Sequence, residues 1–217
     1  MDTNIRMDFS KRELVNLNEQ EWVRSPVDGV FRIPLERDAA ESGHATSLVK
    51  YLPGASFPHH QHPGGEEILV LDGVFSDEKG DYGPGTYLRN PAGSSHAPFS
   101  KEGCTIFVRL NQFQSGDSDK LRIDTLKEPW QSGYGNLKVM PLHQFATESV
   151  ALVKWPQNER FIPHTHFGGE EIFVISGTFI DEHGEYPERT WTRSPHLSNH
   201  SPWVKEETLI MVRTGHI

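Results

Sequence analysis

Two stretches of the sequence place histidines and carboxylates around a pair of glycines. The first reads FPHHQHPGGEE over residues 57–67, and the second reads FIPHTHFGGEE over residues 161–171. Another histidine follows the first glutamate of each stretch by 30 residues (96−66 and 200−170). Three imidazoles and one carboxylate that converge form a ligand set for a divalent transition metal. The predicted metal ligands are His60, His62, Glu66 and His96 in the first copy, and His164, His166, Glu170 and His200 in the second.

The spacing of these residues suits a strand, because side chains two positions apart in a strand point to the same face. His60, His62 and Glu66 then share a face, and the Gly64-Gly65 pair permits a bulge or bend that brings the carboxylate to the histidines. A lone His-x-His on a strand is more often a pair of solvent-exposed histidines that bind no metal. Here the glutamate and the distant histidine recur at fixed offsets, which favours metal binding. The alternative that one of the two sites has lost its metal and become an empty pocket is left open. Pro163 replaces His59 in the second copy, so we expect His59 to be dispensable.

The ligand types restrict the metal without identifying it. Imidazole suits zinc, iron, copper and nickel, and one carboxylate oxygen extends the choice toward manganese and iron. No thiolate takes part, because Cys104 is the single cysteine and Thr208 occupies its place in the second copy. We expect two sites for a divalent transition metal, with zinc or iron favoured and manganese and nickel left open.

The elements that position these residues are repeated as well. Subtracting 104 from positions in the second half aligns the two halves without a gap over a long stretch. One repeat runs from about Trp22 to Asn111 and the other from about Trp130 to the C-terminus, with a polar connector at 112–128. We therefore expect two domains: residues 1–114, a first barrel with a short N-terminal extension, and residues 115–217, the connector and a second barrel.

Each repeat reads as a series of short strands. Segments such as EEILVLDGVF and TIFVRL are rich in β-branched and aromatic residues, and glycine-containing turns separate them. Helical periodicity is weak, with one exception near residues 11–21. Many short strands with dense turns predict an all-β chain of two small barrels in tandem.

Composition narrows the function further. The 217 residues carry a formal charge of −9 and no cluster of lysine or arginine, which argues against nucleic acid as a direct ligand. No apolar run approaches the roughly 18 residues of a membrane span, and the first residues lack the apolar core of a signal peptide. With one cysteine, no intrachain disulfide can form. We expect a cytoplasmic protein, with no nucleic acid or membrane partner and with a homodimer left open.

The motifs resemble those of the cupin superfamily. Its first motif, G-x5-H-x-H-x3-E-x6-G, and its second, G-x5-P-x-G-x2-H, are both present in the first repeat without a gap. The second repeat keeps the ligands but has Asn158, Arg189 and Leu197 in place of framing glycines. The resemblance covers nearly the whole chain and implies a bicupin, two double-stranded β-helix (jelly-roll) barrels in tandem. The matched positions of the first repeat are Gly54, His60, His62, Glu66 and Gly73, then Gly85, Pro91, Gly93 and His96.

A narrower resemblance is to the cupin domain of ChrR-type anti-sigma factors, through H-x-H-x-G-G-E-E-I followed by G-x-F-x-D-E-x-G-x-Y. That family carries a metal on the matching His60, His62, Glu66 and His96 and responds to singlet oxygen or related oxidants. Its sigma-binding domain is an N-terminal zinc domain built on His and paired Cys. Residues 1–21 contain neither residue type, so sigma-factor binding is not expected.

Other charged residues recur between the copies. Lys50 and Glu67, matched by Lys154 and Glu171, favour an ion pair on the surface or rim, with support of the metal glutamate as the alternative. Arginines near strand ends are expected to be solvated, the alternative being that they hold an anionic substrate in a pocket. These arginines are Arg89, Arg109, Arg193 and Arg213.

Three functions remain compatible with the sequence. The first is a metal-binding protein linked to the response to an oxidant or small molecule, which would act at the metal site. The second is an enzyme, an iron-type dioxygenase acting on a small ketone or diketone, since three histidines and a glutamate leave open positions on an octahedral ion. The third is a double barrel in which closed tetrahedral metal sites only hold strands together. No general base or nucleophile is evident beyond the ligands, so whether the chain is an enzyme stays open.

Overall fold

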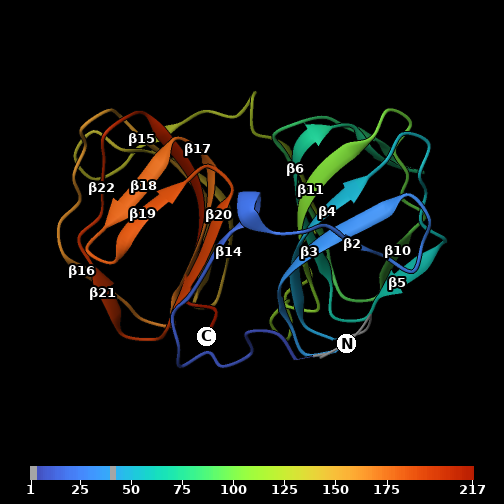
Figure 1. Cartoon of the computed structure of the whole chain (residues 1–217), viewed down its shortest axis with the longest axis horizontal. Coiled ribbons are helices and arrows are strands. Elements are labelled where there is room, and N and C mark those ends of the chain that lie inside the picture. The colour runs from blue at the N-terminus through green and yellow to red at the C-terminus, as the bar shows by residue number, and fades with distance from the viewer. Residues whose placement is uncertain (1–3, 40–42) are drawn as a thin grey trace. The chain divides into compact units, whose positions relative to one another are not determined.

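The computed structural model describes residues 4–39 and 43–217, and strands dominate it (Figure 1). Within the described residues the one helical element is the short 3-10 turn η1 (Leu17–Glu19). Two compact units are present: unit 1 comprises Met1–Met7 and Glu21–Glu128, and unit 2 comprises Asp8–Gln20 and Pro129–Ile217. The prediction of an all-β chain with two barrels is confirmed. No helix among the described residues is long and apolar enough to cross a membrane.

Unit 1 is built on a seven-stranded antiparallel sheet and two small two-stranded sheets. The large sheet has the order β12 (Leu121–Asp124), β9 (Thr86–Asn90), β6 (Glu66–Gly73), β11 (Cys104–Leu110), β4 (Ala45–Tyr51), β3 (Val30–Arg37) and β2 (Val23–Arg24). The small sheets pair β5 (His60–His62) with β10 (Ser94–His96), and β7 (Phe75–Asp77) with β8 (Gly80–Tyr82).

Unit 2 repeats this plan. Its large sheet has the order β1 (Glu13–Asn16), β20 (Thr190–Ser194), β17 (Glu170–Ser176), β23 (Thr208–Thr214), β15 (Glu148–Trp155), β14 (Lys138–Phe145) and β13 (Gln131–Ser132). The smaller sheets pair β16 (His164–His166) with β21 (Ser198–His200), and place β18 (Thr178–Asp181) between β19 (Gly184–Pro187) and β22 (Trp203–Val204).

The core of each barrel comes from alternate residues of the large sheet. In β6 and β11 the inward side chains include Ile68, Val70, Ile106 and Val108, which pack with Phe75 from the small sheet. The matching residues of unit 2 form an equivalent cluster. Because the side-chain period of a strand is two, Glu66 falls in phase with this inward face. The sheet therefore directs the glutamate into its barrel.

An edge strand of each large sheet comes from outside the repeats. Strand β12 lies in the predicted polar connector and pairs with β9, with Leu121 opposite Arg89. Strand β1 precedes the first repeat and pairs with β20 of unit 2, with Glu13 opposite Arg193. The two segments that group differently from the predicted ranges are therefore 8–20 and 115–128. The ranges 1–114 and 115–217 stay a prediction.

The stretch near residues 11–21, the exception to the weak helical periodicity of the sequence, does not form an α-helix. This segment forms β1 and then η1, whose first turn is capped by the side chain of Asn16 accepting from the backbone N–H of Asn18 at 3.1 Å. The buried residues of the segment are Val15 and Leu17. Their spacing of two is the period of a strand, so pairing with β20 prevails over a weak helical preference.

Candidate metal centre

The predicted ligands of the first repeat meet inside unit 1. His60 and His62 lie on β5, and β10 pairs antiparallel with β5 so that His96 is directly opposite His60. Glu66 begins β6 after the turn at Gly64-Gly65, where Gly65 has φ of +83°. This left-handed conformation, which favours glycine, lets the chain turn between β5 and β6.

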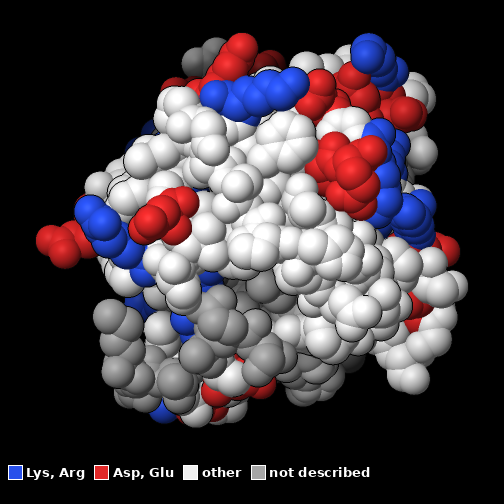
Figure 2. Space-filling view, turned by 90° about the vertical axis from the view of Figure 1, so that its right-hand side faces the viewer, with Lys and Arg blue, Asp and Glu red and all other residues white. Residues whose placement is uncertain are grey.

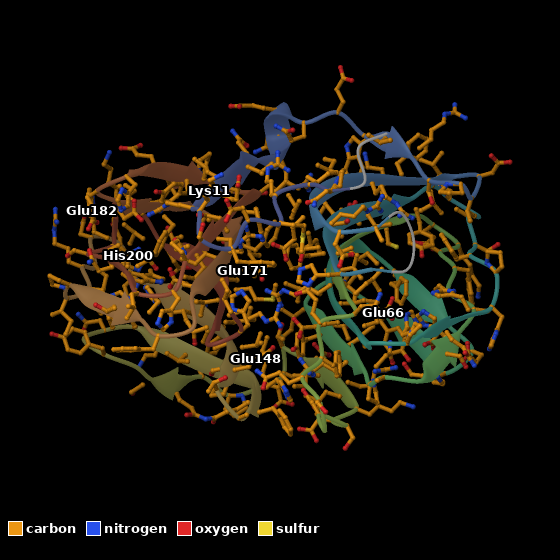
Figure 3. All side chains as sticks on the ribbon, turned by 90° about the horizontal axis from the view of Figure 1, so that it is seen from below. Lys11, Glu66, Glu148, Glu171, Glu182 and His200 are labelled. Atoms are coloured by element: carbon orange, nitrogen blue, oxygen red, sulfur yellow. The ribbon has the colours of Figure 1, made fainter. Side chains whose placement is uncertain are left out.

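Unit 2 repeats the arrangement. His200 lies opposite His164 in the β16–β21 pair, and Glu170 begins β17. Figure 3 shows Glu66 among the strands of one unit and His200 among the strands of the other. In each set one atom from every residue lies within 4.8 Å of the others. The structure thus brings the eight predicted residues together in two clusters, whereas His59 is exposed.

The distances within each cluster suit a single ion. In unit 1 the Nε2 atoms of His62 and His96 each lie 3.5 Å from Oε2 of Glu66. In unit 2 the Nε2 atoms of His166 and His200 are 3.1 Å apart. Ligand atoms bound at about 2.1 Å to one ion are separated by roughly 3.0–3.4 Å, whether its geometry is octahedral or tetrahedral. The donors are therefore close to the spacing that one divalent ion requires.

The protonation of the donors also fits a cation. The Nε2 atoms of His62 and His96 are buried and have no hydrogen-bond partner in the structure. Burial, with neighbouring histidines, lowers the pKa of His62 to about 3 and that of His96 to about 4, so both rings are neutral at pH 7. Burial raises the pKa of Glu66 to about 7. Two neutral imidazole lone pairs beside a costly buried carboxylate are what a divalent ion would stabilise.

Hydrogen bonds orient several of the ligands. Nδ1 of His60 donates to the carbonyl of Pro58 at 2.8 Å, which leaves Nε2 for a metal. His164 makes the same bond to Ile162 at 2.9 Å. The amide Nδ2 of Asn90 donates to Oε2 of Glu66 at 2.9 Å. These bonds fix the rings and the carboxylate before any ion binds.

A buried aspartate lies behind the distant histidine of each set. Nδ1 of His200 donates to Oδ2 of Asp181 at 3.2 Å, and Nδ1 of His96 lies 3.5 Å from Oδ2 of Asp77. Asp77 and Asp181 occupy the same position in the repeated sequences FSDEKGDY and FIDEHGEY, but the sequence pattern alone does not predict that they contact a histidine. A carboxylate behind a metal-binding imidazole raises its basicity and holds the ring in place.

The framing glycines lost from the second repeat leave the backbone unchanged. Gly93 has φ of +82°, and Leu197, which replaces it, has φ of +62°. The turn also keeps its bond, because Gly93 N donates to His62 O at 2.8 Å and Leu197 N donates to His166 O at 2.9 Å. Asn158 and Arg189 also have positive φ. The turns beside the ligands are therefore held by the surrounding structure rather than by glycine alone.

The expected roles of the recurring charged residues are wrong. Glu67 is buried and pairs with Arg89, at 2.6 Å, and with Arg109, on the face of β6 opposite Glu66. Arg89 also pairs with Asp117 at 2.6 Å. In place of a rim ion pair, Lys50 lies over the ring of Trp22, 4.1 Å from its centroid.

Unit 2 shows a related pattern. Arg213 pairs with Glu148 at 2.9 Å and lies 3.8 Å from Glu171. Figure 3 labels both of these glutamates. Trp191 donates to Glu171 at 2.8 Å. Because Arg193 and Arg213 are buried, the recurring arginines are neither solvated nor placed on the ligand face of the sheet.

A cavity adjoins each ligand set. In unit 2 it has a volume of about 330 Å³ and is lined by all four predicted ligands together with Trp155, Phe161, Val139 and Val153. In unit 1 it measures about 120 Å³, and His60, His62 and Glu66 line it with Arg32 and Arg37. An ion at either site would therefore lie next to space that a small molecule can enter.

Comparisons with known proteins agree with this architecture. A family model described as the ChrR cupin-like domain matches residues 10–114 and again residues 118–217. A solved structure from Nostoc punctiforme, named as a "putative dioxygenase", superposes with a TM-score of 0.80 at 17% identity, covering 94% of this chain and 82% of that one. AerE from Microcystis aeruginosa gives a TM-score of 0.65 at 15% identity, with 89% and 95% covered.

A variant of oxalate decarboxylase from Bacillus subtilis gives a TM-score of 0.65 at 14% identity, covering 93% of this chain and 76% of that one. At these identities the likeness concerns the fold. No curated protein matches the chain.

Proposed function

This chain belongs to the ChrR cupin-like domain family, and we propose that it is a double-cupin metalloprotein that binds one divalent ion in each barrel and a small molecule beside it. The predicted ligands are the two clusters described above. Zinc or iron is favoured, with manganese and nickel as alternatives, because three imidazoles and one carboxylate suit all four.

The observation that carries this proposal is the cavity of about 330 Å³ lined by His164, His166, Glu170 and His200. A metal that only joins strands would occupy a closed site with no adjoining space. Here the ligands lie in the wall of a cavity whose other residues are mainly apolar, the usual character of a small-molecule site. When bound, the ion would supply Lewis acidity or redox chemistry to a ligand in this cavity.

For the physiological role, we propose a cytoplasmic protein that responds to an oxidant or small molecule at its metal sites. Membership of the ChrR cupin-like family supports this role. The chain's own residues would contribute ring orientation through Asp77 and Asp181, and an apolar wall that excludes water in unit 2. In such a sensor, an oxidant or ligand would change the occupancy of the metal.

A dioxygenase is the second candidate. It is supported by the apolar cavity beside three histidines, which suits a small ketone or diketone, and by the name of the Nostoc punctiforme structure. The two candidates differ in what happens to oxygen. An enzyme would consume oxygen in proportion to substrate, whereas a sensor would lose metal or change shape without turnover.

The test begins with purification without chelator and elemental analysis for zinc, iron, manganese and nickel. About two ions per chain are expected, and a protein that holds none after reconstitution with each of these metals would overturn the proposal. The metal-loaded protein is then exposed to hydrogen peroxide or singlet oxygen, and to a panel of small diketones with an oxygen electrode. Release of metal by the oxidant supports the sensor, and oxygen consumption with a diketone supports the enzyme.

A further inference from the structure

We propose that the cavity of unit 1 binds a small organic carboxylate, whereas the cavity of unit 2 takes an uncharged ligand. This rests on the proposed function, because the ligand would lie beside the ion of the first site. It goes beyond that function by separating the two barrels, whose metal ligands are the same but whose cavity walls are not.

The first step is the register of β3, which carries two arginines into the cavity. Arg32 lies opposite Val49 of β4, and Arg37 lies opposite Ala45. Five positions separate the arginines, so in a regular strand they would point to opposite faces. The register of β3 and β4 shifts between Pro34 and Glu36, and this irregularity returns the two arginine side chains to the same face of the sheet. Both arginines consequently line the same cavity.

The second step is the charge of this cavity. Its lining includes Arg32, Arg37 and one acidic residue, Glu66, which is itself a predicted metal ligand. A divalent ion would more than balance the glutamate, and the two guanidinium groups add charged hydrogen-bond donors to the same cavity wall. Nη2 of Arg32 donates to Oγ of Ser25 at 2.9 Å, which restrains the guanidinium. A planar guanidinium recognises a carboxylate through two parallel hydrogen bonds.

The third step is size and shape. At about 120 Å³ the cavity is somewhat smaller than an engineered protein cavity of about 150 Å³ that binds benzene. A carboxylate of two to four carbons is of this order. Val49, Ile106 and Val108 supply apolar walls, which suit the carbon part of such a ligand better than inorganic phosphate. The first site is therefore matched to a short organic acid.

The fourth step is the comparison with unit 2, which acts as an internal control. There the residue opposite Val153 is Val139, which takes the place of Arg32. The residue opposite Ser149 is Gln144, which takes the place of Arg37 and is exposed. The unit 2 cavity is larger, about 330 Å³, and its lining contains no arginine or lysine. The same fold thus presents a cationic wall to one ion and an apolar wall to the other.

The experiment measures binding rather than activity. Zinc-loaded protein is titrated calorimetrically with three carboxylates: acetate, pyruvate and malonate. Pyruvamide, an uncharged analogue of pyruvate, tests whether the negative charge is needed. Inorganic phosphate tests whether any anion binds equally well. At least one carboxylate should bind once per chain, and pyruvamide and phosphate should bind at least tenfold more weakly. Arg32→Met and Arg37→Met should each weaken carboxylate binding tenfold or more.

Arg24→Met serves as the control. It makes the same change of charge at an exposed arginine outside the cavity and should leave carboxylate binding unchanged. Elemental analysis and a melting curve accompany each variant, and Arg37→Met provides the test if Arg32→Met does not fold.

Each outcome decides a different question. Protein without metal refutes the proposed function. Protein with two ions leaves that function standing but overturns the carboxylate assignment if no acid in the panel binds, if two bind per chain, if phosphate competes equally, or if folded arginine variants bind as well as the wild type.

Discussion

Arg12 donates a hydrogen bond of 2.7 Å to Asp181, a residue 169 positions later in the chain. Asp181 in turn accepts a bond from Nδ1 of His200, so a residue that precedes the first repeat reaches the second ligand set through one carboxylate. Although burial raises the pKa of Asp181, bonds from His200, Tyr186 and Arg12 hold it below the usual range. The pairing of β1 with β20 makes this contact, because it places the N-terminal segment on unit 2.

Arg12→Met should therefore weaken the second metal site and spare the first. Loss of a group that orients a metal ligand typically costs tenfold to a hundredfold in affinity. The measurement is zinc affinity by competition with a chromophoric chelator, in the His62→Ala background, where only the second site is left intact. Arg12→Met in the His166→Ala background, where only the first site is intact, should leave the zinc affinity unchanged.

Lys11→Met is the matched control, since the side chain of Lys11 is 70% exposed and pairs only locally with Asp8. Equal affinities for Arg12→Met and Lys11→Met at the second site would show that the contact with Asp181 does not support the metal.

Metal stoichiometry should follow the two clusters independently. His62 and His166 are buried and lie in different units, so loss of one imidazole should not affect the other site. We expect about two ions per chain in the wild type, about one in His62→Ala, and almost none in the double variant with His166→Ala. His59→Ala, at the exposed neighbouring histidine, is the control and should retain two. Retention of two ions by the double variant would refute these residues as ligands.

Removal of metal should lower the melting temperature. Each ion would join β5, β6 and β10, or their counterparts in unit 2. An ion that binds only the folded state stabilises it by about 2.7 kcal/mol when the free ion concentration is a hundred times Kd. For a chain of this size 1 kcal/mol corresponds to roughly 2–4 °C. We expect dialysis against chelator, which removes both ions, to lower the transition by about 10–20 °C, and readdition of zinc to restore it. The same melting curve before and after verified removal would argue against stabilising sites.

Glu66 provides a prediction about pH in the metal-free protein. Its folded-state pKa is raised by burial from 4.5 to about 7, so the folded state binds a proton that the unfolded state has released. The resulting stability is fully present below pH 4.5 and is lost as pH rises through about 7. Glu66→Gln fixes a neutral side chain and should make the metal-free protein more stable than the wild type at pH 8, by about 1–3 kcal/mol. The same variant should lose the first metal site.

Urea denaturation of metal-free protein at pH 5 and pH 8 checks this prediction. The wild-type difference between the two pH values should shrink in Glu66→Gln, and Glu170→Gln should behave alike because the pKa of Glu170 is also raised to about 7. A variant less stable than the wild type at pH 8 would mean that the ionised carboxylate is well solvated or paired in the absence of metal.

The sequence predicted the clusters because their geometry is local and duplicated. The two histidines of β5 and the glutamate of β6 are separated by one turn, and the repeat supplied an independent copy at the same offsets. Arg12 could not be predicted in this way, because nothing in its neighbourhood indicates that β1 pairs with β20 rather than within unit 1. The burial of Arg89 and Arg109 was missed for a related reason, since the partner Glu67 is opposite them only when three strands are paired.

On the surface of unit 1, basic and acidic side chains lie in mixed groups with uncharged areas between them (Figure 2). The net charge of −9 is therefore not gathered into one acidic patch on the face shown. Composition alone could exclude a strongly basic face, but it could not locate the two arginines of the first cavity, whose position depends on the register shift in β3.

Leu197 gives the last prediction, on stability. This residue holds φ of +62° at a position where the first repeat has Gly93, and a side chain larger than glycine in the left-handed region costs roughly 1–2 kcal/mol. A Cβ at Gly93 would have nothing within 4 Å, and Leu197 is 53% exposed, so little packing opposes the change. Leu197→Gly should therefore stabilise the protein by about 1 kcal/mol, with zinc content unchanged because the bond from its N–H to His166 O is kept. Urea denaturation of the metal-loaded protein measures the gain, and the reciprocal Gly93→Leu should lose a similar amount. Equal stability of Leu197→Gly and the wild type would show that the leucine side chain makes contacts that offset its backbone strain.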